Sequence, residues 1–273
     1  MRLQATRGWS ALNLSELWRY RELIYFLAWR DVKVRYKQTV VGVIWVLLQP
    51  LAMMAVFSLI FGRTAQWPTD GVPYPLYVLV ALVPWQFFSR VISESTSSLI
   101  TDQRLITRVY FPRLVVPIAT ALTAFVDFGL AMSLVGLLMI WFGAIPGLSL
   151  LFLPLAVFLM VVAALGAGFW LSALNVEYRD VMHAVPFLVQ FWFFLTPVVY
   201  STSWLPAPWD IVLSLNPMTA VVDGFRSSLL GSTASHNFAS LSATVAIALF
   251  ISGMVWFRRR ERSFVDSLGS GGA

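Results

Sequence analysis

Six long apolar stretches dominate the sequence, and each is long enough to cross a lipid bilayer as a helix. The hydrocarbon core of a bilayer is about 30 Å thick, which corresponds to about 20 residues of α-helix. The stretches are Thr39–Gly62, Val72–Ser89 with an apolar continuation to Ile100, Leu114–Phe142, Ile145–Leu174, Val181–Tyr200 and Phe238–Phe257. We therefore expect an all-α, polytopic membrane protein with six transmembrane helices.

The composition leads to the same class of protein. Hydrophobic residues make up 59% of the 273 residues and charged residues 12%, whereas soluble domains have about 45–50% and about 25%. One globular core of this length cannot bury so much apolar surface, which excludes a secreted soluble enzyme, a nucleic-acid-binding module and a disordered chain. The sequence contains no cysteine, so disulfides and thiolate metal sites are excluded as well.

The positions of the basic residues predict the orientation. Eight Lys and Arg precede the first stretch, and others follow the second, fourth and sixth stretches: Arg104, Arg108 and Arg113; Arg179; and Arg258, Arg259, Arg260 and Arg262. Sixteen of the 19 basic residues thus fall on one side of the membrane. Since cytoplasmic loops are enriched in Lys and Arg, we expect both termini in the cytoplasm.

The segment Ser203–Gly231 is apolar but too interrupted to span. Pro206, Pro208 and the pair Asn216-Pro217 divide it into halves of about 15–20 Å as helices. A seventh crossing would also move the last basic cluster outside. We therefore expect a re-entrant hairpin over residues 203–231 that enters from the external side; the alternative is a loop on the external surface.

The chain is predicted to have three regions, of which the first and the last are cytoplasmic. Residues 1–38 form a cytoplasmic N-terminus, residues 39–257 the membrane domain and residues 258–273 a basic tail. Within the first, Asn13–Lys37 alternates aromatic and basic residues at helical spacing, which is typical of a helix lying at the membrane interface. This helix is either an anchor or a lever that turns with the first span.

Two loops are candidate docking points for a soluble partner. The segment Thr101–Arg113 combines arginines with an apolar Val-Tyr-Phe cluster, and Asn175–Asp180 is a short charged loop. A plain connector is the alternative for each. The candidate coupling residues are Arg104, Leu105, Ile106, Arg108, Tyr110, Phe111, Arg113, Glu177 and Arg179.

Several strings resemble the permease subunit of bacterial ATP-binding-cassette exporters for polysaccharides, within the type-2 export permease superfamily. They are RDVKVRYKQ, VYFPR, NVEYRDV and LNPMTAVVDGFR. The resemblance implies a homodimer of six-span permeases with two nucleotide-binding ATPase subunits, and a lipid-linked glycan such as O-antigen, capsular polysaccharide or teichoic acid as substrate. It also implies a gate helix at residues 13–37, a coupling helix at 101–113 and re-entrant helices at 203–231.

The chain lacks an ATP site of its own. A phosphate-binding loop needs a Gly-rich backbone followed by Lys and Ser or Thr, and neither Lys33 nor Lys37 follows such a loop. We therefore expect no catalytic residue, metal or cofactor in this chain, with ATP and Mg²⁺ used by the partner. We expect Arg30, Lys33, Arg35 and Lys37 of the gate helix to hold the substrate's pyrophosphate.

Two further groups lie within the predicted spans. Arg90 and Glu94 are four residues apart and predict a structural ion pair, while Asp127 lies in the third span with Arg90 as its nearest candidate partner. Trp85, Phe87, Phe88, Phe187, Phe191, Phe194 and Tyr200 are candidate channel-lining aromatics; packing in the core or against lipid is the alternative.

The function that we expect is therefore the permease half of an ATP-driven exporter of lipid-linked polysaccharide. Two alternatives remain at the level of sequence. The same architecture can export a drug or small amphiphile, and a proton-coupled carrier can be built around Asp127.

Overall fold

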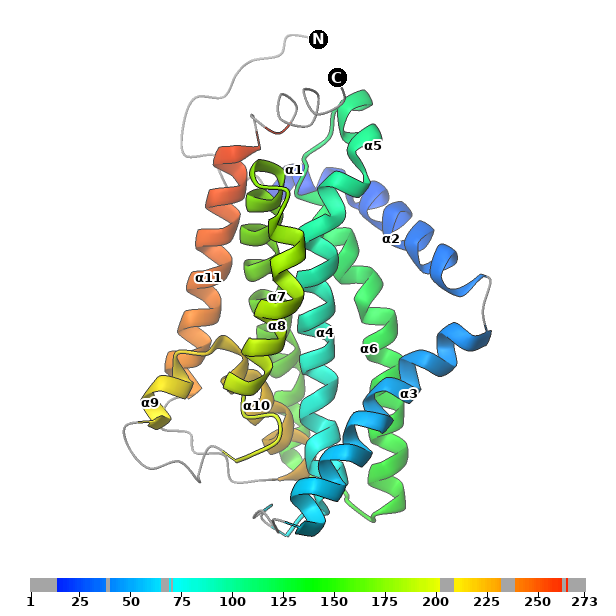
Figure 1. The fold of residues 1–273 in the computed structure, drawn as a ribbon, viewed down its shortest axis with the longest axis vertical. Coiled ribbons are helices and arrows are strands. Elements are labelled where there is room, and N and C mark those ends of the chain that lie inside the picture. The colour runs from blue at the N-terminus through cyan, green and yellow to red at the C-terminus, as the bar shows by residue number, and fades with distance from the viewer. Residues whose placement is uncertain are drawn as a thin grey trace.

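The computed structural model describes residues 14–37, 40–64, 69, 71–201, 209–231, 239–261 and 264. In these residues the chain is helical and contains no strand (Figure 1). The elements are α1 (Leu14–Arg19), α2 (Arg21–Tyr36), α3 (Val40–Phe57), the π-helical turn η2 (Ser58–Thr64), α4 (Tyr74–Thr101), α5 (Gln103–Arg108), α6 (Val115–Trp141), the 3₁₀ turn η3 (Leu148–Phe152), α7 (Leu153–Glu177), α8 (Val181–Leu195), α9 (Trp209–Ser214), α10 (Pro217–Leu230) and α11 (Ala239–Arg260).

Five of the described helical segments are long and apolar enough to cross a bilayer. They are Ile44–Gly62, Tyr74–Thr101, Val115–Trp141, Leu148–Glu177 and Ala239–Arg260. They agree with five of the six predicted spans to within a few residues at most ends, and the all-α, polytopic class is confirmed. The first predicted span starts at Thr39, which is outside the described residues, as is Phe238 at the start of the last.

The fifth predicted span is shorter than expected. Its helix α8 ends at Leu195 rather than Tyr200, and 15 residues extend only about 22 Å. Thr196 is extended because Pro197 follows it, and the residue before a proline is disfavoured in the helical region.

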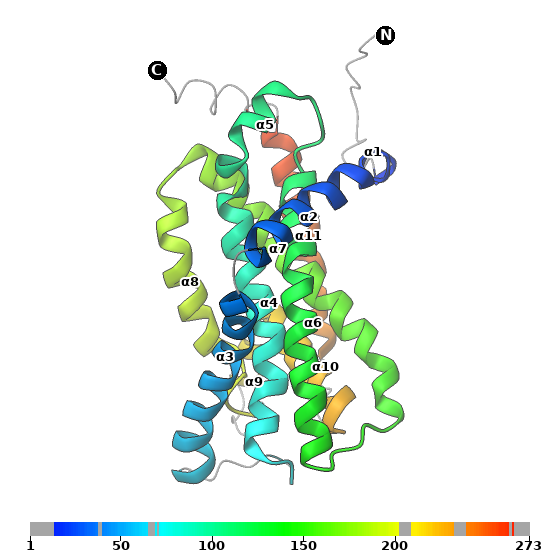
Figure 2. The ribbon, with the colours of Figure 1, turned by 90° about the vertical axis from the view of Figure 1, so that its right-hand side faces the viewer.

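Helix α4 forms the centre of the molecule. In its apolar window 78% of the residues are buried, against 6% for the first span, and it packs against α3, α6, α7, α8 and α10. Leu76, Val78 and Leu79 have no exposed surface, so the first turns of α4 are covered on every side, as expected for a core helix. Helix α3 lies at the periphery (Figures 1 and 2).

Glycines allow the helices around α4 to approach closely. A Cβ on Gly168 of α7 would lie 3.1 Å from Ser95 Cβ of α4, and one on Gly166 would lie 2.7 Å from the backbone nitrogen of Phe250 in α11. The small-residue stripe of Ala164, Gly168 and Ser172 is therefore used for packing inside one subunit.

Helix α6 ends in a Schellman motif. Gly143 has a φ of 67°, and the amide of Ala144 donates to the carbonyl of Met139 at 2.9 Å. Glycine is favoured here because a left-handed conformation is costly for other residues. The motif ends α6 and turns the chain toward η3 and α7.

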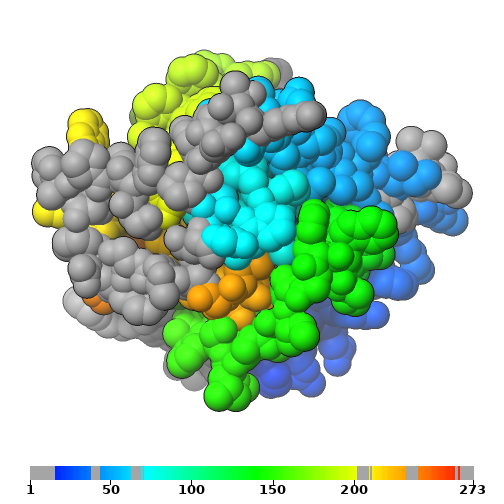
Figure 3. All heavy atoms as spheres, turned by 90° about the horizontal axis from the view of Figure 1, so that it is seen from below, coloured from blue at the N-terminus to red at the C-terminus, as the bar shows by residue number. Residues whose placement is uncertain are grey.

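Helix α10 is an interior element of the fold. Asn216 caps it by accepting a hydrogen bond from the amide of Met218, and Val221, Val222 and Phe225 are fully buried. It packs against α4, α7 and α11. Viewed from below, α10 lies between the start of α4 and the α6–α7 hairpin (Figure 3). This position supports a re-entrant element over a surface loop, although residues 202–208 are outside the described residues.

One end of the molecule, which we call the basic end, carries α1, α5, the start of α8 and the last turn of α11 (Figures 1 and 2). Helices α9 and α10 and the α6–α7 hairpin belong to the opposite half. The predicted helix over residues 13–37 is two helices separated at Tyr20, and Asn13, its predicted cap, is outside the described residues.

Candidate functional site

Helix α2 packs on the bundle with a face that its charge pattern did not predict. Leu27 and Ala28 are buried, and Leu17, Tyr20, Leu23 and Ile24 are partly buried against the same cluster. By contrast the aromatic side chains of Trp18, Tyr25 and Trp29 are 70%, 65% and 46% exposed. These aromatic rings point away from the bundle, where an interfacial helix meets lipid headgroups.

An ion pair joins α2 to the start of the predicted docking segment. Arg30 Nη1 lies 3.0 Å from Asp102 Oδ1, and Arg30 Nε lies 2.8 Å from Asp31 Oδ1. The hydrogen bond to Asp102 is the main reason that the pKa of Arg30 lies above its ordinary value; burial opposes the effect and Asp31 adds to it. Arg30 is thus held charged, with its guanidinium directed at the loop after α4.

The docking segment, residues 101–113, has an inner and an outer side. Ile106 and Phe111 are 4% and 3% exposed and fill the subunit's own core, so they anchor the segment instead of presenting it, contrary to their expected role. Tyr110 is 77% exposed, and Arg104, Arg108 and Val109 are exposed beside it. Leu105 is half-buried. In the short helix α5 only one side faces the core. Ile106 lies on that side, whereas Val109 and Tyr110, which follow the helix, are exposed.

The C-terminal end of α11 ties the other loops of the basic end together. Arg113 Nη1 donates to the carbonyl of Glu261 at 2.8 Å, and its amide donates to Glu261 Oε1 at 2.7 Å. Arg260 pairs with Glu177 at 2.9 Å, while Arg179 is exposed beside Glu177. The two candidate docking loops are therefore both bonded to the end of the last span.

A groove runs along the outer side of α2. It has a volume of about 400 Å³ and is lined by Phe26, Trp29, Arg30, Lys33, Val34 and Lys37. Three of the four residues predicted to hold pyrophosphate thus line one groove. The fourth, Arg35, points elsewhere.

Arg35 belongs to a charged cluster between α2, α4 and α6. Its Nη2 lies 2.5 Å from Glu94 Oε1 and its Nη1 lies 2.7 Å from Asp127 Oδ2. Arg90 also pairs with Asp127, and Tyr36 donates its hydroxyl to the other oxygen of Asp127. The predicted pair of Arg90 and Glu94 is the longest contact of the cluster, at 3.8 Å.

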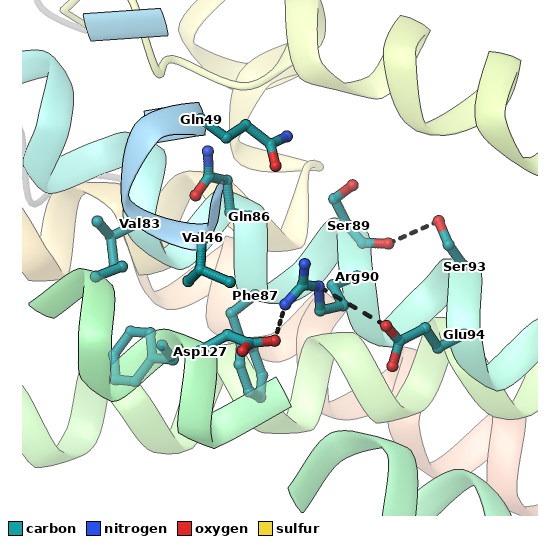
Figure 4. A pocket seen from close by; sticks show the side chains of 12 residues that line it. Val46, Gln49, Val83, Gln86, Phe87, Ser89, Arg90, Ser93, Glu94 and Asp127 are labelled. Carbon is teal, nitrogen blue, oxygen red and sulfur yellow. Dashed lines mark hydrogen bonds and ion pairs between the residues drawn. The ribbon is translucent and has the colours of Figure 1, made fainter. Parts of the chain in front are cut away.

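A polar cavity of about 220 Å³ adjoins this cluster (Figure 4). Its wall combines residues from α3, α4 and α6: Val46, Gln49, Val83, Gln86, Phe87, Ser89, Arg90, Ser93, Glu94, Asp127, Phe128 and Ala131. A cavity of this size and polarity holds several water molecules or a small polar ligand. Ionisable groups inside a membrane protein are costly, so a charged cluster beside a cavity is a functional candidate.

The predicted channel-lining aromatics fall into two groups. Trp85, Phe87 and Phe88 are at most 5% exposed; Trp85 packs on Phe193 and Phe88 on Trp192. Their places in the core differ from the expected lining, because α4 is surrounded by other helices.

The aromatic residues of α8 remain accessible. Phe187, Phe191 and Phe194 are 73%, 57% and 63% exposed, and Tyr200 is half-buried with its hydroxyl 3.4 Å from the carbonyl of Phe194. The first three form an exposed stripe on one side of α8. Their channel-lining role stays a prediction.

Several residues in these sites were not predicted. Asp102, Tyr36 and the two glutamines of the cavity had no assigned role, although a Gln within each of two predicted spans is itself an unusual signal. Arg226 also had no assigned role; it is 2% exposed and donates to the carbonyls of Pro197 and Val198. No local pattern reveals such a long-range pairing.

Comparison with known proteins places the chain in a family. The profile of the ABC-2 type transporter family matches residues 22–230, which covers α2 to α10. The chain belongs to the ABC-2 type transporter family. This match confirms the predicted superfamily and includes the charged cluster, the cavity and the docking segment.

Individual relatives extend over almost the whole chain. The O-antigen export system permease protein RfbA of Myxococcus xanthus is 28% identical over 261 residues, 93% of this chain and 98% of its own length. RfbA of Klebsiella pneumoniae is 24% identical, covering 90% of this chain and 95% of its own. The polysialic acid transport protein KpsM of Escherichia coli is 22% identical, covering 87% and 93%.

Proposed function

We propose that the chain is the membrane-spanning permease subunit of an ATP-driven exporter that moves a lipid-linked polysaccharide out of the cytoplasm. The observation that carries this proposal is the end-to-end similarity to permeases named for O-antigen export and polysialic acid transport. Two kinds of named glycan are represented among them, which favours polysaccharide over a drug or small amphiphile. An O-antigen or teichoic-acid type of glycan is the proposed cargo.

In this proposal the basic end faces the cytoplasm of a bacterial cell and the protein lies in the plasma membrane. The positive-inside rule supports this orientation, because the docking segment and the end of α11 carry most of the arginines that follow the first span. The chain has no cysteine, so single cysteines report accessibility without background. We expect an impermeant maleimide to label Gly147→Cys in intact cells and Thr107→Cys only after the membrane is opened; the reverse pattern would contradict the orientation.

ATP hydrolysis is assigned to a separate subunit. The sequence contains no phosphate-binding loop, and Mg²⁺ and ATP would be held by two copies of that partner. Its proposed docking surface is the exposed side of residues 101–113, with Arg104, Arg108 and Tyr110, extended by Arg179. An exposed tyrosine among arginines is a composition typical of interface anchors.

The ion pairs provide a route from that surface to the membrane interior. A displacement of the docking segment acts on α2 through Asp102 and Arg30, which are 3.0 Å apart. The C-terminal end of α2, just beyond Arg30, is bonded through Arg35 to Glu94 in α4 and Asp127 in α6. Helix α2 thus connects the proposed motor to the spans, which supports a lever over a simple anchor.

The proposed substrate has a charged end and a sugar chain. The groove on α2 combines Lys33 and Lys37 with apolar side chains, which suits a pyrophosphate attached to a lipid. The sugar chain would pass between two permease subunits. The exposed apolar faces of α3 and α8, with Trp45 and Phe191, supply surface for such a homodimer and its conduit.

A deletion experiment in the host tests the function. Loss of the gene should remove the long glycan from the cell surface and accumulate lipid-linked glycan inside, and the intact gene should restore export. Unchanged surface glycan would contradict the proposal. Unchanged glycan together with increased sensitivity to a lipophilic drug would instead support the small-amphiphile alternative.

A further inference from the structure

We propose that the cavity between α3, α4 and α6 is a binding site for one sugar unit of the exported glycan. The inference rests on the proposed function and adds a site whose wall is formed within a single subunit. Four features of the cavity carry it: its polar groups, the unpartnered amide of Gln86, its balanced charge and its apolar wall.

The polar groups of the cavity match a ring with several hydroxyl groups. Gln49 from α3 and Gln86 from α4 contribute amides, and Arg90, Glu94 and Asp127 contribute planar charged groups to the same wall (Figure 4). Each of these side chains is planar and can bond to two neighbouring hydroxyls at once. A sugar hydroxyl both donates and accepts, so it can be satisfied by such a mixed lining.

The side-chain amide of Gln86 gives the most specific indication that the cavity binds a ligand. Its Nε2 atom is buried and has no hydrogen-bond partner among the described residues. A buried amide group without a partner costs about 1–3 kcal/mol, so its persistence at a cavity wall indicates a ligand or a water that satisfies it. The amide belongs to the central helix α4, which holds its position rigidly.

The balance of charge selects a neutral ligand. The two carboxylates of the wall, Glu94 and Asp127, are bonded to two guanidinium groups, Arg35 and Arg90. An anion would meet carboxylates and a cation would meet arginines, each already paired. The described residues also contain no group of three His, Asp or Glu side chains that could hold a metal.

The remaining wall is apolar and partly aromatic. Val46 and Val83 line the cavity together with Phe87 and Phe128. The ring centroids of the two phenylalanines are 5.7 Å apart, in an edge-to-face arrangement. A sugar ring has apolar C–H faces and polar edges, and therefore fits a cavity whose wall combines charged and aromatic side chains. A purely polar ion site would not need these rings.

The site is connected to helix α2. Arg35 and Tyr36, at the end of α2, are bonded to Asp127, and Arg35 is also bonded to Glu94. A movement of α2 would remove these bonds and leave the two carboxylates, still paired with Arg90, with lone pairs to accept hydroxyl groups. Binding of a sugar unit is thereby linked to the position of the helix that connects to the docking segment.

Photo-crosslinking in exporting cells tests the site. A photoreactive benzoyl-phenylalanine at Val46 reaches into the cavity, and the same group at Leu137, which is 61% exposed on α6, serves as the matched control. The permease is purified after irradiation, and a lectin detects any glycan attached to it. Glycan export by the parent chain is measured in parallel. We expect a glycan ladder attached at Val46 and none at Leu137. Adducts at Val46 that contain only lipid would overturn the site.

The variant Gln86→Leu separates binding from folding. Loss of one or two hydrogen bonds to the sugar should lower the Val46 adduct and the export rate about three- to tenfold. The thermal midpoint should be unchanged or higher, since leucine removes an unsatisfied buried amide. Export at the parent rate, or a lower midpoint that accounts for the loss, would overturn the proposal. If the parent chain itself does not export glycan, the proposed function fails; export without the adduct contradicts only the sugar site.

Discussion

Arg35 Nη1, at the end of the surface helix α2, lies 2.7 Å from Asp127 Oδ2 in the middle of α6. Asp127 is 6% exposed and also accepts from Arg90 and Tyr36. One buried carboxylate therefore fixes an interfacial helix to two membrane spans. The charged cluster links α2 to α4 and α6, and it also forms one edge of the polar cavity.

The first prediction concerns the loss of this carboxylate. Asp127→Asn leaves two arginines without their shared partner, and we expect a destabilisation of about 1–3 kcal/mol, below the value for a fully buried pair because Arg35 and Arg90 are partly exposed. Thermal unfolding in detergent measures it, with Glu22→Gln on the exposed side of α2 as the control.

A double-mutant cycle identifies the partner of Asp127. Combining Arg35→Gln with Asp127→Asn should cost less than the sum of the single changes, by about 0.5–3 kcal/mol. Strict additivity would show that the contact contributes nothing. Lost export with unchanged stability and ATPase activity in Asp127→Asn would instead favour a proton-coupled carrier.

The second prediction concerns the ion pair of Arg30 and Asp102. Its side chains are 38% and 15% exposed, so breaking it should change the free energy of unfolding by at most about 1 kcal/mol. We expect Arg30→Gln to retain ATPase activity of the assembled complex while the export of glycan per ATP falls several-fold. The exchange of the two charges, Arg30→Asp with Asp102→Arg, should restore part of the coupling. Coupling equal to that of the parent protein in both variants would show that the pair does not transmit movement.

Arg226 supports the third prediction. Its guanidinium lies 3.7 Å from the ring centroid of Tyr77 and donates to the carbonyl oxygens of Pro197, Val198 and Tyr200. Arg226→Met leaves buried carbonyls without donors, which should cost about 2–4 kcal/mol and lower the thermal midpoint by several degrees.

Two variants provide the comparison for Arg226. Lysine keeps the charge but lacks the fork that bonds several carbonyls, so Arg226→Lys should restore only part of the stability. Arg19→Met removes an exposed arginine of α1 and should have no effect. If Arg226→Met is as stable as the parent protein, Arg226 does not hold the chain after α8.

The fourth prediction tests the close contact of α7 and α11. A Cβ on Gly166 would lie 2.7 and 2.8 Å from the backbone nitrogen and Cα of Phe250, so Gly166→Ala forces the helices apart at a cost of about 1–3 kcal/mol. A Cβ added to Gly136 in α6 would meet nothing within 4 Å, and Gly136→Ala should be neutral or stabilising. Equal thermal midpoints for the two variants would contradict this packing.

The apolar runs were sufficient to predict five of the six expected membrane helices, because a span must be long and apolar wherever it lies in the bundle; the sixth, α8, is shorter than expected. They could not show which spans are central. Helices α3 and α4 are both apolar, yet one is almost wholly uncovered and the other is the core. That difference depends on tertiary contacts, and it is why Trp85, Phe87 and Phe88 were predicted in a channel and lie in the interior.

The candidate sites were predictable where the contact is local. Arg90 and Glu94 are four residues apart, and the spacing alone places them together. The stronger contacts of the same cluster join residues separated by 59 and 92 positions, Arg35 to Glu94 and Arg35 to Asp127. The pair of Arg30 and Asp102 is equally remote. Only the arrangement of α2 across α4 and α6 brings these charges together.

Reconstitution of transport tests the central claim most directly. The permease is purified with the host's nucleotide-binding ATPase subunit and placed in liposomes with the host's lipid-linked glycan, and a lectin measures the glycan that crosses. We predict that glycan crosses only when both subunits and hydrolysable ATP are present. Transport by the permease without the ATPase, or an assembled, ATP-hydrolysing complex that leaves the glycan in place, would contradict the account.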